Sequence, residues 1–302
     1  MGGNPRKMLS AGSLRASIRG DGLIMENEIT FKDELAPGVK LIKVRAPLIA
    51  KKARSGQFVI LRASEDGERI PLTLIDWDPK EGTITLVFRE VGASTKELGR
   101  LEVGDAIHDL VGPLGRPGEV AFYGRACVIG GGVAIAAAYE RAKSLKEAGN
   151  SLTAIIGART AGQLIFKDQL RKVVDRLYTT TDDGSEGVKG SPSDLLRSLL
   201  ESGERFDLVF AVGPEALMKS VSEATRPYNI KTIVSLNSLM VDGTGMCGCC
   251  RVTVGGRTMF TCVDGPEFDA HLVDFDELMA RLRMYEEEER LALKVVGRRC
   301  RG

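Results

Sequence analysis

The sequence predicts an antiparallel β-barrel followed by an α/β domain with a parallel sheet, and then a short cysteine-rich segment. Short alternating apolar runs fill residues 27–123, strand-like and helix-like runs alternate over 124–236, and four of the six cysteines lie between positions 247 and 262. A chain of 302 residues is long enough for two such domains. We expect an extension at 1–24, the barrel at 25–123, the parallel-sheet domain at 124–236 and a third segment at 237–302.

The composition excludes several classes of protein. The net charge is +1, and no stretch combines clustered Lys and Arg with aromatic residues, so nothing indicates nucleic-acid binding. The longest apolar run, around 134–138, is far shorter than the roughly 18 residues of a membrane span. Clustered cysteines do not resemble a disulfide framework, which favours a reducing, cytoplasmic setting. Residues 1–24 lack an apolar core, so we expect a loosely structured extension rather than a secretory signal.

The barrel prediction depends on short alternating runs separated by turn residues. Pro-Gly, Ser-Gly, Glu-Gly and Gly-Pro pairs stand next to these runs, a spacing typical of a small antiparallel barrel. One helix is expected at 94–101, with Ser94 as its N-cap. The predicted strands are 39–46, 57–63, 83–89 and 105–111.

Near Gly124 the pattern changes to buried strands that alternate with helices. An apolar strand at 126–129 leads into three glycines and an apolar helix at 133–148. Repeated βαβ units imply a parallel sheet covered by helices, and ligands of such sheets bind at the carboxyl ends of the strands. The other predicted strands are 152–156, 177–181, 208–212 and 232–236. The other predicted helices are 164–174, 193–200 (capped by Ser193), 215–224 and, after the cysteines, 276–293.

The cysteine-rich segment has the spacing of an iron–sulfur site. Asp242, Cys247, Cys250 and Cys262 are separated by four, two and eleven residues, and the plant-type [2Fe–2S] pattern is C-x4-C-x2-C…C. An Asp therefore stands where the first Cys of that pattern would be. Cys249 could be the fourth ligand instead, although adjacent residues rarely direct both side chains to one small cluster. A zinc site made from the same residues is the chemical alternative.

Glycines and carboxylates follow the strands of the α/β domain, where a dinucleotide would bind. The glycine turn at 130–132 precedes a helix N-terminus, which presents backbone N–H groups to a pyrophosphate. The same glycines could instead allow the helix to pack closely on the strand. The carboxylates at 182 and 183 would repel a 2′-phosphate, which favours NAD over NADP, whereas Arg159 favours the opposite. The candidate residues at these strand ends are Gly131, Gly132, Asp182, Asp183, Gly213 and Met218.

Two motifs in the barrel could hold a diphosphate. The first places a fixed cation, a rigid turn and a hydroxyl within five residues, at Arg69, Pro71 and Thr73. The second opens the one helix predicted for the barrel, where an N-terminus and two hydroxyls suit phosphate groups. Its residues are Gly92, Ser94 and Thr95. An ordinary strand turn and an N-cap would use the same residue types.

Together these motifs resemble the ferredoxin–NADP reductase superfamily over about residues 25–282. The matching stretches are Arg69-x-Pro71-x-Thr73, Gly92-x-Ser94-Thr95, Gly112-Pro-Leu-Gly115 and Gly130-Gly-Gly132. The cysteine loop is similar to those of dihydroorotate dehydrogenase electron-transfer subunits and of the small subunits of NADH-dependent reduced ferredoxin:NADP oxidoreductase. Four Cys ligands are expected in the former, so Asp242 and the stretch 262–271 favour the latter.

The resemblance implies FAD in the barrel, a nicotinamide dinucleotide on the parallel sheet and one [2Fe–2S] cluster facing a larger partner subunit. The residues implied to flank the flavin are Arg69, Pro71, Leu72 and Thr73, with Gly92, Ser94 and Thr95 at its diphosphate. Hydride transfer between cofactors needs no catalytic side chain. The implied function is that of an NAD(H)-dependent electron-transfer subunit in an electron-bifurcating heterodimer that reaches ferredoxin through its partner. The alternatives are the dihydroorotate dehydrogenase subunit and a zinc-stabilised dinucleotide sensor without turnover.

Overall fold

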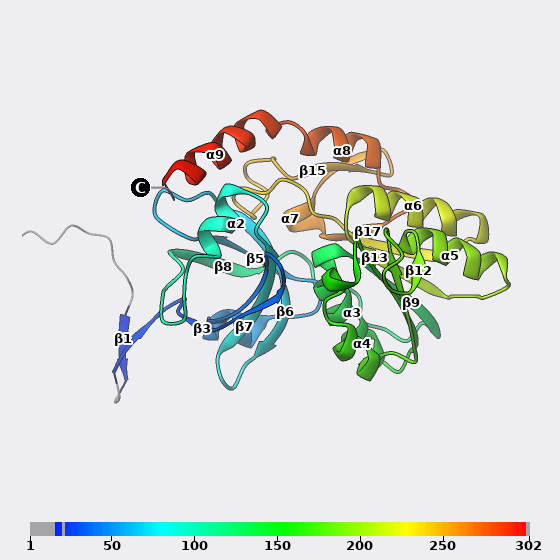
Figure 1. Ribbon diagram of the computed structural model, residues 1–302, viewed down its shortest axis with the longest axis horizontal. Helices are drawn as coiled ribbons and strands as arrows, with labels where there is room; N and C mark the ends of the chain where they lie inside the picture. Colours follow the sequence, from blue (N-terminus) through cyan, green and yellow to red (C-terminus); the bar gives the residue numbers. More distant parts are fainter. Residues whose placement is uncertain (1–15, 20–21, 300–302) are drawn as a thin grey trace, which may run out of the picture.

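The computed structural model describes residues 16–19 and 22–299 and contains two large sheets that lie side by side (Figure 1). One is a six-stranded antiparallel sheet, and the other is a seven-stranded, mostly parallel sheet. The predicted fold class is therefore confirmed. Strands β1 (Ala16–Arg19) and β2 (Gly22–Met25) form a separate antiparallel ribbon, so part of the predicted extension is ordered. The first fifteen positions of that extension lie outside the described residues.

The antiparallel sheet forms the barrel, in the strand order β3-β4-β7-β6-β5-β8. Its apolar side chains alternate inward and form one core, with Ile42, Leu74 and Leu86 fully buried. Strands β3 and β6 were not predicted, and β8 begins four residues later than predicted. The bounds are β3 Ile29–Ala36, β4 Val39–Arg45, β5 Phe58–Arg62, β6 Ile70–Asp78, β7 Thr83–Arg89 and β8 Asp109–Leu114, with helices α1 Pro47–Lys52 and α2 Ala93–Leu98.

The parallel sheet has the order β12-β11-β10-β9-β13-β14-β17, and only β17 runs antiparallel to its neighbour. Alternate residues of β9 face opposite helical layers: Val128 lies in the core with α3, and Ile129 lies in the core with α6. Both faces are thus covered, which explains the continuous apolar strands. The bounds are β9 Arg125–Gly131, α3 Ile135–Glu147, β10 Ser151–Ala158, α4 Lys167–Val173, β11 Arg176–Thr181, β12 Val188–Lys189, α5 Pro192–Glu201, β13 Leu208–Val212, α6 Glu215–Thr225 and β14 Lys231–Ser235. Ser191 rather than Ser193 caps α5.

The C-terminal segment returns to the parallel sheet instead of folding apart from it. After the cysteine loop, β15 (Arg251–Val254) and β16 (Arg257–Phe260) form a hairpin, α7 (Thr261–Asp264) follows, and β17 (Glu267–Asp269) pairs with β14. The single helix predicted at 276–293 is wrong, because α8 (Phe275–Leu282) ends before α9 (Glu286–Arg299) begins. Within the described residues, no helix is both long and apolar enough to cross a membrane.

Candidate functional site

A cavity of about 530 Å³ lies between the barrel and the parallel sheet, and both predicted cofactor regions line it. We call it the shared cavity. Its size is typical of small-molecule sites, which range from about 300 to 1,000 Å³. The predicted residues that line it are Pro71, Leu72, Thr73 and Thr95 from the barrel, and Gly131, Gly132 and Gly213 from the parallel sheet. Two motifs that are separate in the sequence therefore face one space.

On the barrel side, β6 presents the predicted flavin motif. Pro71 is opposite Ile60 in the β5–β6 ladder, so the predicted rigid turn at this position is wrong and the motif is a strand. Thr73 is half-buried at the cavity wall. Arg69 is exposed and does not line the cavity, whereas Arg89, at the end of β7, does. The cation at the cavity thus comes from a neighbouring strand that the sequence motif did not include.

The first turn of α2 differs from the prediction in its cap. The helix begins at Ala93 with Gly92 as its N-cap, so the prediction of Ser94 in that role is wrong. The hydroxyl of Thr95 accepts hydrogen bonds from the backbone N–H groups of Val91 (3.1 Å) and Gly92 (3.0 Å). The Ser94 hydroxyl instead donates to a Glu68 carboxylate oxygen at 3.3 Å. Of the three predicted diphosphate residues, only Thr95 lines the cavity.

On the sheet side, the two lining glycines of the turn differ in their surroundings. A Cβ on Gly131 would lie 2.6 Å from Leu217 and 3.1 Å from Pro214, so this glycine allows close packing against the start of α6. Gly132 has a φ of +60°, and a Cβ there would meet nothing within 4 Å. Gly132 therefore supplies a left-handed backbone at the cavity wall and leaves the space beside it open.

The other predicted dinucleotide residues are not brought to the cavity. Met218 is fully buried in the core between the sheet and α6, because it lies one turn inside the helix on its inward face. Asp182 and Asp183 follow β11, two strands away from β9, and are exposed. Hydrogen bonds from the Ser185 hydroxyl and backbone N–H lower the pKa of Asp183. Glu215, in the first turn of α6, does line the cavity, and burial raises its pKa.

The cysteine loop, which we define as residues 237–250, packs on the barrel. Gly243 has a φ of +74°, and a Cβ there would lie 2.7 Å from Leu114 and 2.8 Å from Ile60. The Asp242 carboxylate accepts hydrogen bonds from the backbone N–H groups of Thr244 and Cys247, both at 2.7 Å. The Thr244 bond is the main cause of a lowered pKa at Asp242. The loop is therefore shaped by its glycines and by the same carboxylate that was predicted as a ligand.

The predicted cysteine ligands are only partly assembled. The sulfur atoms of Cys250 and Cys262 lie 3.2 Å apart and are buried, whereas Cys247 is exposed. Burial and the close contact between the two thiols raise the pKa of Cys262 to about 12. The Thr261 backbone N–H and hydroxyl both donate to the Cys250 carbonyl oxygen at 3.0 Å, which fixes the two cysteines side by side. Over residues 16–19 and 22–299, no three His, Cys, Asp or Glu side chains converge on a single ion position.

This donor set nevertheless suits a two-iron cluster. Such a cluster divides its ligands between two metal ions, so four donors need not converge on one point. A paired buried dithiol can serve one iron, while the donors at 242 and 247 lie on one turn of the loop, joined by the bond from the Cys247 N–H. Cys249 is half-buried, its N–H contacts the Cys247 sulfur at 3.5 Å, and its carbonyl oxygen accepts from Arg281.

The shared cavity and the cysteine pair are joined by common residues. Phe58 and Met240 line the cavity, and both belong to the small apolar cluster that contains Cys250 and Cys262. Sequence reasoning missed both, because neither belongs to a local motif. A group bound in the cavity and a group bound by the cysteines would therefore be separated by the thickness of these side chains.

Comparisons with known proteins agree with this arrangement. Residues 237–274 match the family described as the iron-sulfur cluster binding domain of dihydroorotate dehydrogenase B. A Thermotoga maritima protein named as a homolog of the electron transfer subunit of dihydroorotate dehydrogenase B (NAD(+)) is 48% identical, over 90% of this chain and 97% of that protein. A Methanopyrus kandleri protein, named as the probable subunit itself, is 37% identical over 70% of this chain and 78% of its own length.

Solved structures extend the comparison to the whole fold. A chain from the structure of an NADH-dependent reduced ferredoxin-NADP oxidoreductase, described as giving insights into flavin-based electron bifurcation, is 47% identical with a TM-score of 0.85. The match covers 89% of this chain and 97% of that one. Phthalate dioxygenase reductase is 16% identical with a TM-score of 0.55, over 75% of this chain and 85% of its own, and shares the fold alone. The chain belongs to the family of dihydroorotate dehydrogenase B electron-transfer subunits and their homologues.

Proposed function

We propose that this chain passes electrons between NAD(H), an FAD in the shared cavity and a [2Fe–2S] cluster held by the cysteine loop and Cys262, and through that cluster to or from a larger partner subunit. The observation that carries this proposal is that Phe58 and Met240 line the shared cavity and also pack in the apolar cluster that contains Cys250 and Cys262. A flavin exchanges a hydride with a nicotinamide dinucleotide and single electrons with an iron–sulfur cluster.

The described residues have distinct roles in this proposal. On the barrel side, Thr73 and Thr95 would orient the flavin and Arg89 would offset negative charge at the cavity. On the sheet side, the open turn at Gly132 would receive a pyrophosphate, and Glu215 would contact the dinucleotide from the start of α6. Cys247, Cys250 and Cys262 would hold the cluster, with Asp242 as the fourth ligand. Met240 and Phe58 would exclude water between the two sites.

Replacing one cysteine ligand tests flavin reduction by NADH separately from onward electron transfer. The change Cys262→Ser should leave FAD bound and reducible by NADH, but abolish onward transfer to a one-electron acceptor. Cys127→Ala is the matched control, because Cys127 is a buried thiol in β9 and does not belong to the apolar cluster around Cys250 and Cys262. Loss of NADH-dependent flavin reduction in Cys262→Ser, or unimpaired onward transfer by that variant, would contradict the proposed layout.

We further propose that the complete complex is a flavin-based electron-bifurcating, NADH-dependent ferredoxin:NADP oxidoreductase. The similarity at 47% identity over nearly the full length supports this assignment, as does Asp242 in place of a first cysteine. The alternative is the electron-transfer subunit of dihydroorotate dehydrogenase B, which the family match at 237–274 favours. The complex isolated with its native partner distinguishes them. Coupled use of NADH and reduced ferredoxin to reduce NADP⁺ supports the first, and NAD⁺-dependent oxidation of dihydroorotate supports the second.

A further inference from the structure

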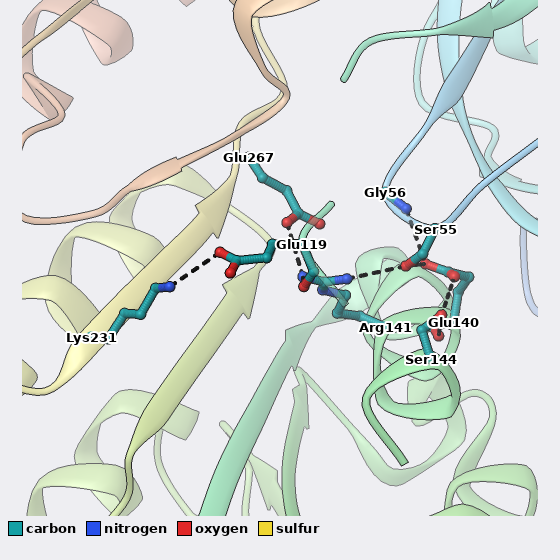
Figure 2. A network of polar contacts seen from close by, with 8 residues as sticks. All are labelled: Ser55, Gly56, Glu119, Glu140, Arg141, Ser144, Lys231 and Glu267. Carbon is teal, nitrogen blue, oxygen red and sulfur yellow. Dashed lines mark hydrogen bonds and ion pairs between the residues drawn. The ribbon is translucent and has the colours of Figure 1, made fainter. Parts of the chain in front are cut away.

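Three charged side chains are buried together where the barrel, α3 and β17 meet (Figure 2). Arg141 is 1% exposed, Glu140 is 4% exposed, and the Glu267 side chain is 9% exposed. Charged groups are seldom buried to this extent, and burial costs free energy unless they are paired. None of the three lines the shared cavity, so contact with a cofactor does not explain them. We call this group the joint.

Arg141 links segments that are far apart in the sequence. Its guanidinium donates to the Ser55 hydroxyl at 3.2 Å, the Glu119 carbonyl oxygen at 2.6 Å and the Glu267 carboxylate at 3.2 Å. These acceptors belong to the turn before β5, to the connection between the barrel and the parallel sheet, and to β17 (Figure 2). The planar guanidinium presents its N–H groups in a fixed fork, so one side chain can donate to all three acceptors in set directions.

Glu140, the preceding residue of α3, holds the same barrel turn. Its carboxylate accepts from the Ser55 hydroxyl at 3.2 Å, from the Gly56 backbone N–H at 3.4 Å and from the Ser144 hydroxyl at 2.9 Å. Two consecutive side chains of one helix therefore bind one turn of the barrel. This arrangement attaches the barrel to α3 through polar contacts in addition to apolar packing.

Glu267 reaches the joint through a space that two glycines leave open. A Cβ on Gly56 would lie 2.7 Å from a Glu267 carboxylate oxygen, and a Cβ on Gly118 would lie 2.5 Å from that same oxygen. The Gly118 N–H also donates to the Ser55 carbonyl oxygen at 2.8 Å, so the barrel turn and the connection are closed around this carboxylate. Among the described residues, Arg141 is nonetheless the one donor to the Glu267 carboxylate, and the other oxygen of that carboxylate has no hydrogen-bond partner.

The joint lies on the elements that form the shared cavity. Ala136 and Ala137 line the cavity from the same helix as Arg141, and Pro266 lines it immediately before Glu267. Pro266 also lies between α7, which contains Cys262, and β17. A shift of the barrel relative to α3 or β17 would therefore change the cavity wall and its relation to the cysteine pair.

We propose that Arg141 and Glu267 are positioning residues that hold the barrel against the parallel sheet in the arrangement that forms the shared cavity. The inference rests on the proposed function in that the cavity is where hydride transfer occurs. Neither residue contacts the reacting groups; each acts by fixing the two domains and the cysteine segment relative to one another.

The charges of the joint also make its closure depend on pH. Two buried carboxylates face one arginine, and Glu140 has three donors where Glu267 has one. Burial raises the pKa of Glu267 to about 7; Arg141 opposes this shift, and Glu140 and Glu119 add to it. Glu119 is itself paired with Lys231 at 3.2 Å. The other charged residues that line the small cavity beside Glu267 are Arg116, Asp264 and Asp269.

Opening the joint would return the Glu267 carboxylate to water and to its ordinary pKa. The closed joint is therefore favoured at low pH, and it opens more readily as the pH rises towards 7 and beyond. With a pKa of about 7 in the closed state and 4.5 in water, the open fraction should rise roughly 30-fold between pH 5.5 and 8.5.

Hydrogen exchange of the cofactor-loaded protein tests the joint without relying on turnover. The reporters are the amides of Gly118 and Arg116, which donate to the carbonyl oxygens of Ser55 and Gly265. After correction for intrinsic exchange, Arg141→Met should exchange at least about tenfold faster at both reporters, while the inner strands of either sheet stay unchanged. Arg141→Lys should restore part of the protection. Glu267→Gln, which preserves size, should reduce the pH dependence of the reporters to the part that Glu140 contributes, because burial raises the pKa of Glu140 as well.

A surface ion pair provides the matched control. Arg176→Met removes the Arg176–Glu204 pair at the far side of the parallel sheet and should leave both reporters unchanged. Unchanged reporters in Arg141→Met, equally faster exchange throughout the chain, or full pH dependence in Glu267→Gln would each overturn the proposal. In Arg141→Met, the rate of flavin reduction should fall while the KM for NADH changes little. Failure of the wild-type protein to bind FAD or to be reduced by NADH would overturn the proposed function instead, because the same exchange comparison can be made on the full chain without added FAD.

Discussion

The docking of the cysteine loop on the barrel depends on one glycine, and Gly243→Ala should release it. Gly243 has a left-handed backbone, and its Cβ position is occupied by Leu114 and Ile60 at 2.7 and 2.8 Å. Left-handed strain costs about 1–2 kcal/mol, and overpacking of a filled site adds about 1–3 kcal/mol. The docked loop should therefore lose about 2–5 kcal/mol, which corresponds to roughly 30-fold to several-thousand-fold easier undocking.

Iron release to a chelator measures this undocking. In anaerobic protein that holds its FAD, Gly243→Ala should release iron at least about 30-fold faster than wild type, while flavin absorbance stays constant. Gly256→Ala is the matched control, because Gly256 has the same φ of +74° but an added Cβ meets nothing within 4 Å. That variant should lower the free energy of unfolding by about 1–2 kcal/mol without faster iron release. Equal release rates in Gly243→Ala and wild type would refute the role assigned to this contact.

Four further predictions concern single residues. Because burial raises the pKa of Glu267 from 4.5 to about 7, its contribution to stability is present in full below pH 4.5 and is lost as the pH rises to about 7, a change of roughly 3 kcal/mol. Urea unfolding at fixed FAD concentration should therefore show that Glu267→Gln gains stability relative to wild type over this range, and parallel pH profiles would contradict it. Gly132→Ala should weaken NADH binding by up to about tenfold through left-handed strain, with FAD content unchanged; isothermal titration checks this. Cys127 is fully buried with a raised pKa, so mass spectrometry should find it unmodified by iodoacetamide at pH 8 until the protein is unfolded. Asp242→Cys should change the EPR spectrum of the reduced cluster, while Cys249→Ser should not, and the reverse result would make Cys249 the fourth ligand.

The sheets could be predicted because their apolar periodicity is strong, and the errors fall where tertiary contacts decide. Proline in a run of residues usually argues against a strand and so predicts a turn at Pro71, yet Pro71 lies within β6. Glu286 and its acidic neighbours continue the helical pattern of the preceding residues without a Gly or Pro. The sequence therefore shows no signal for the break between α8 and α9.

The site was predictable where a local motif creates it and not where packing does. Gly132 belongs to the glycine motif that follows β9, Thr73 belongs to the motif that lies within β6, and the structure places both at the shared cavity. Arg89 and Met240 reach the cavity only because distant segments meet there. Met218 follows a strand end, as a dinucleotide-binding residue would, but its side chain packs in the core because α6 begins at Glu215 and places Met218 on the inward face of the helix.

The joint illustrates the same limit. Arg141 and Glu140 lie in the middle of a predicted helix, where charged residues ordinarily face solvent. They are buried because the barrel covers this side of α3, and no property of the local sequence indicates that contact. Glu267 is likewise an ordinary strand residue in the sequence. Its carboxylate fits beside the barrel turn because the glycines at 56 and 118 have no side chains there.

EPR of anaerobically purified protein after addition of NADH, together with iron, zinc and flavin quantification, tests the central claim most directly. We expect one FAD and two irons per chain, with a reduced [2Fe–2S] signal that develops on NADH addition. Electrons would then have passed from the nicotinamide through the shared cavity to the cysteine loop. Zinc in place of iron, or a cluster that NADH cannot reduce although the flavin is reduced, would contradict the proposed electron path.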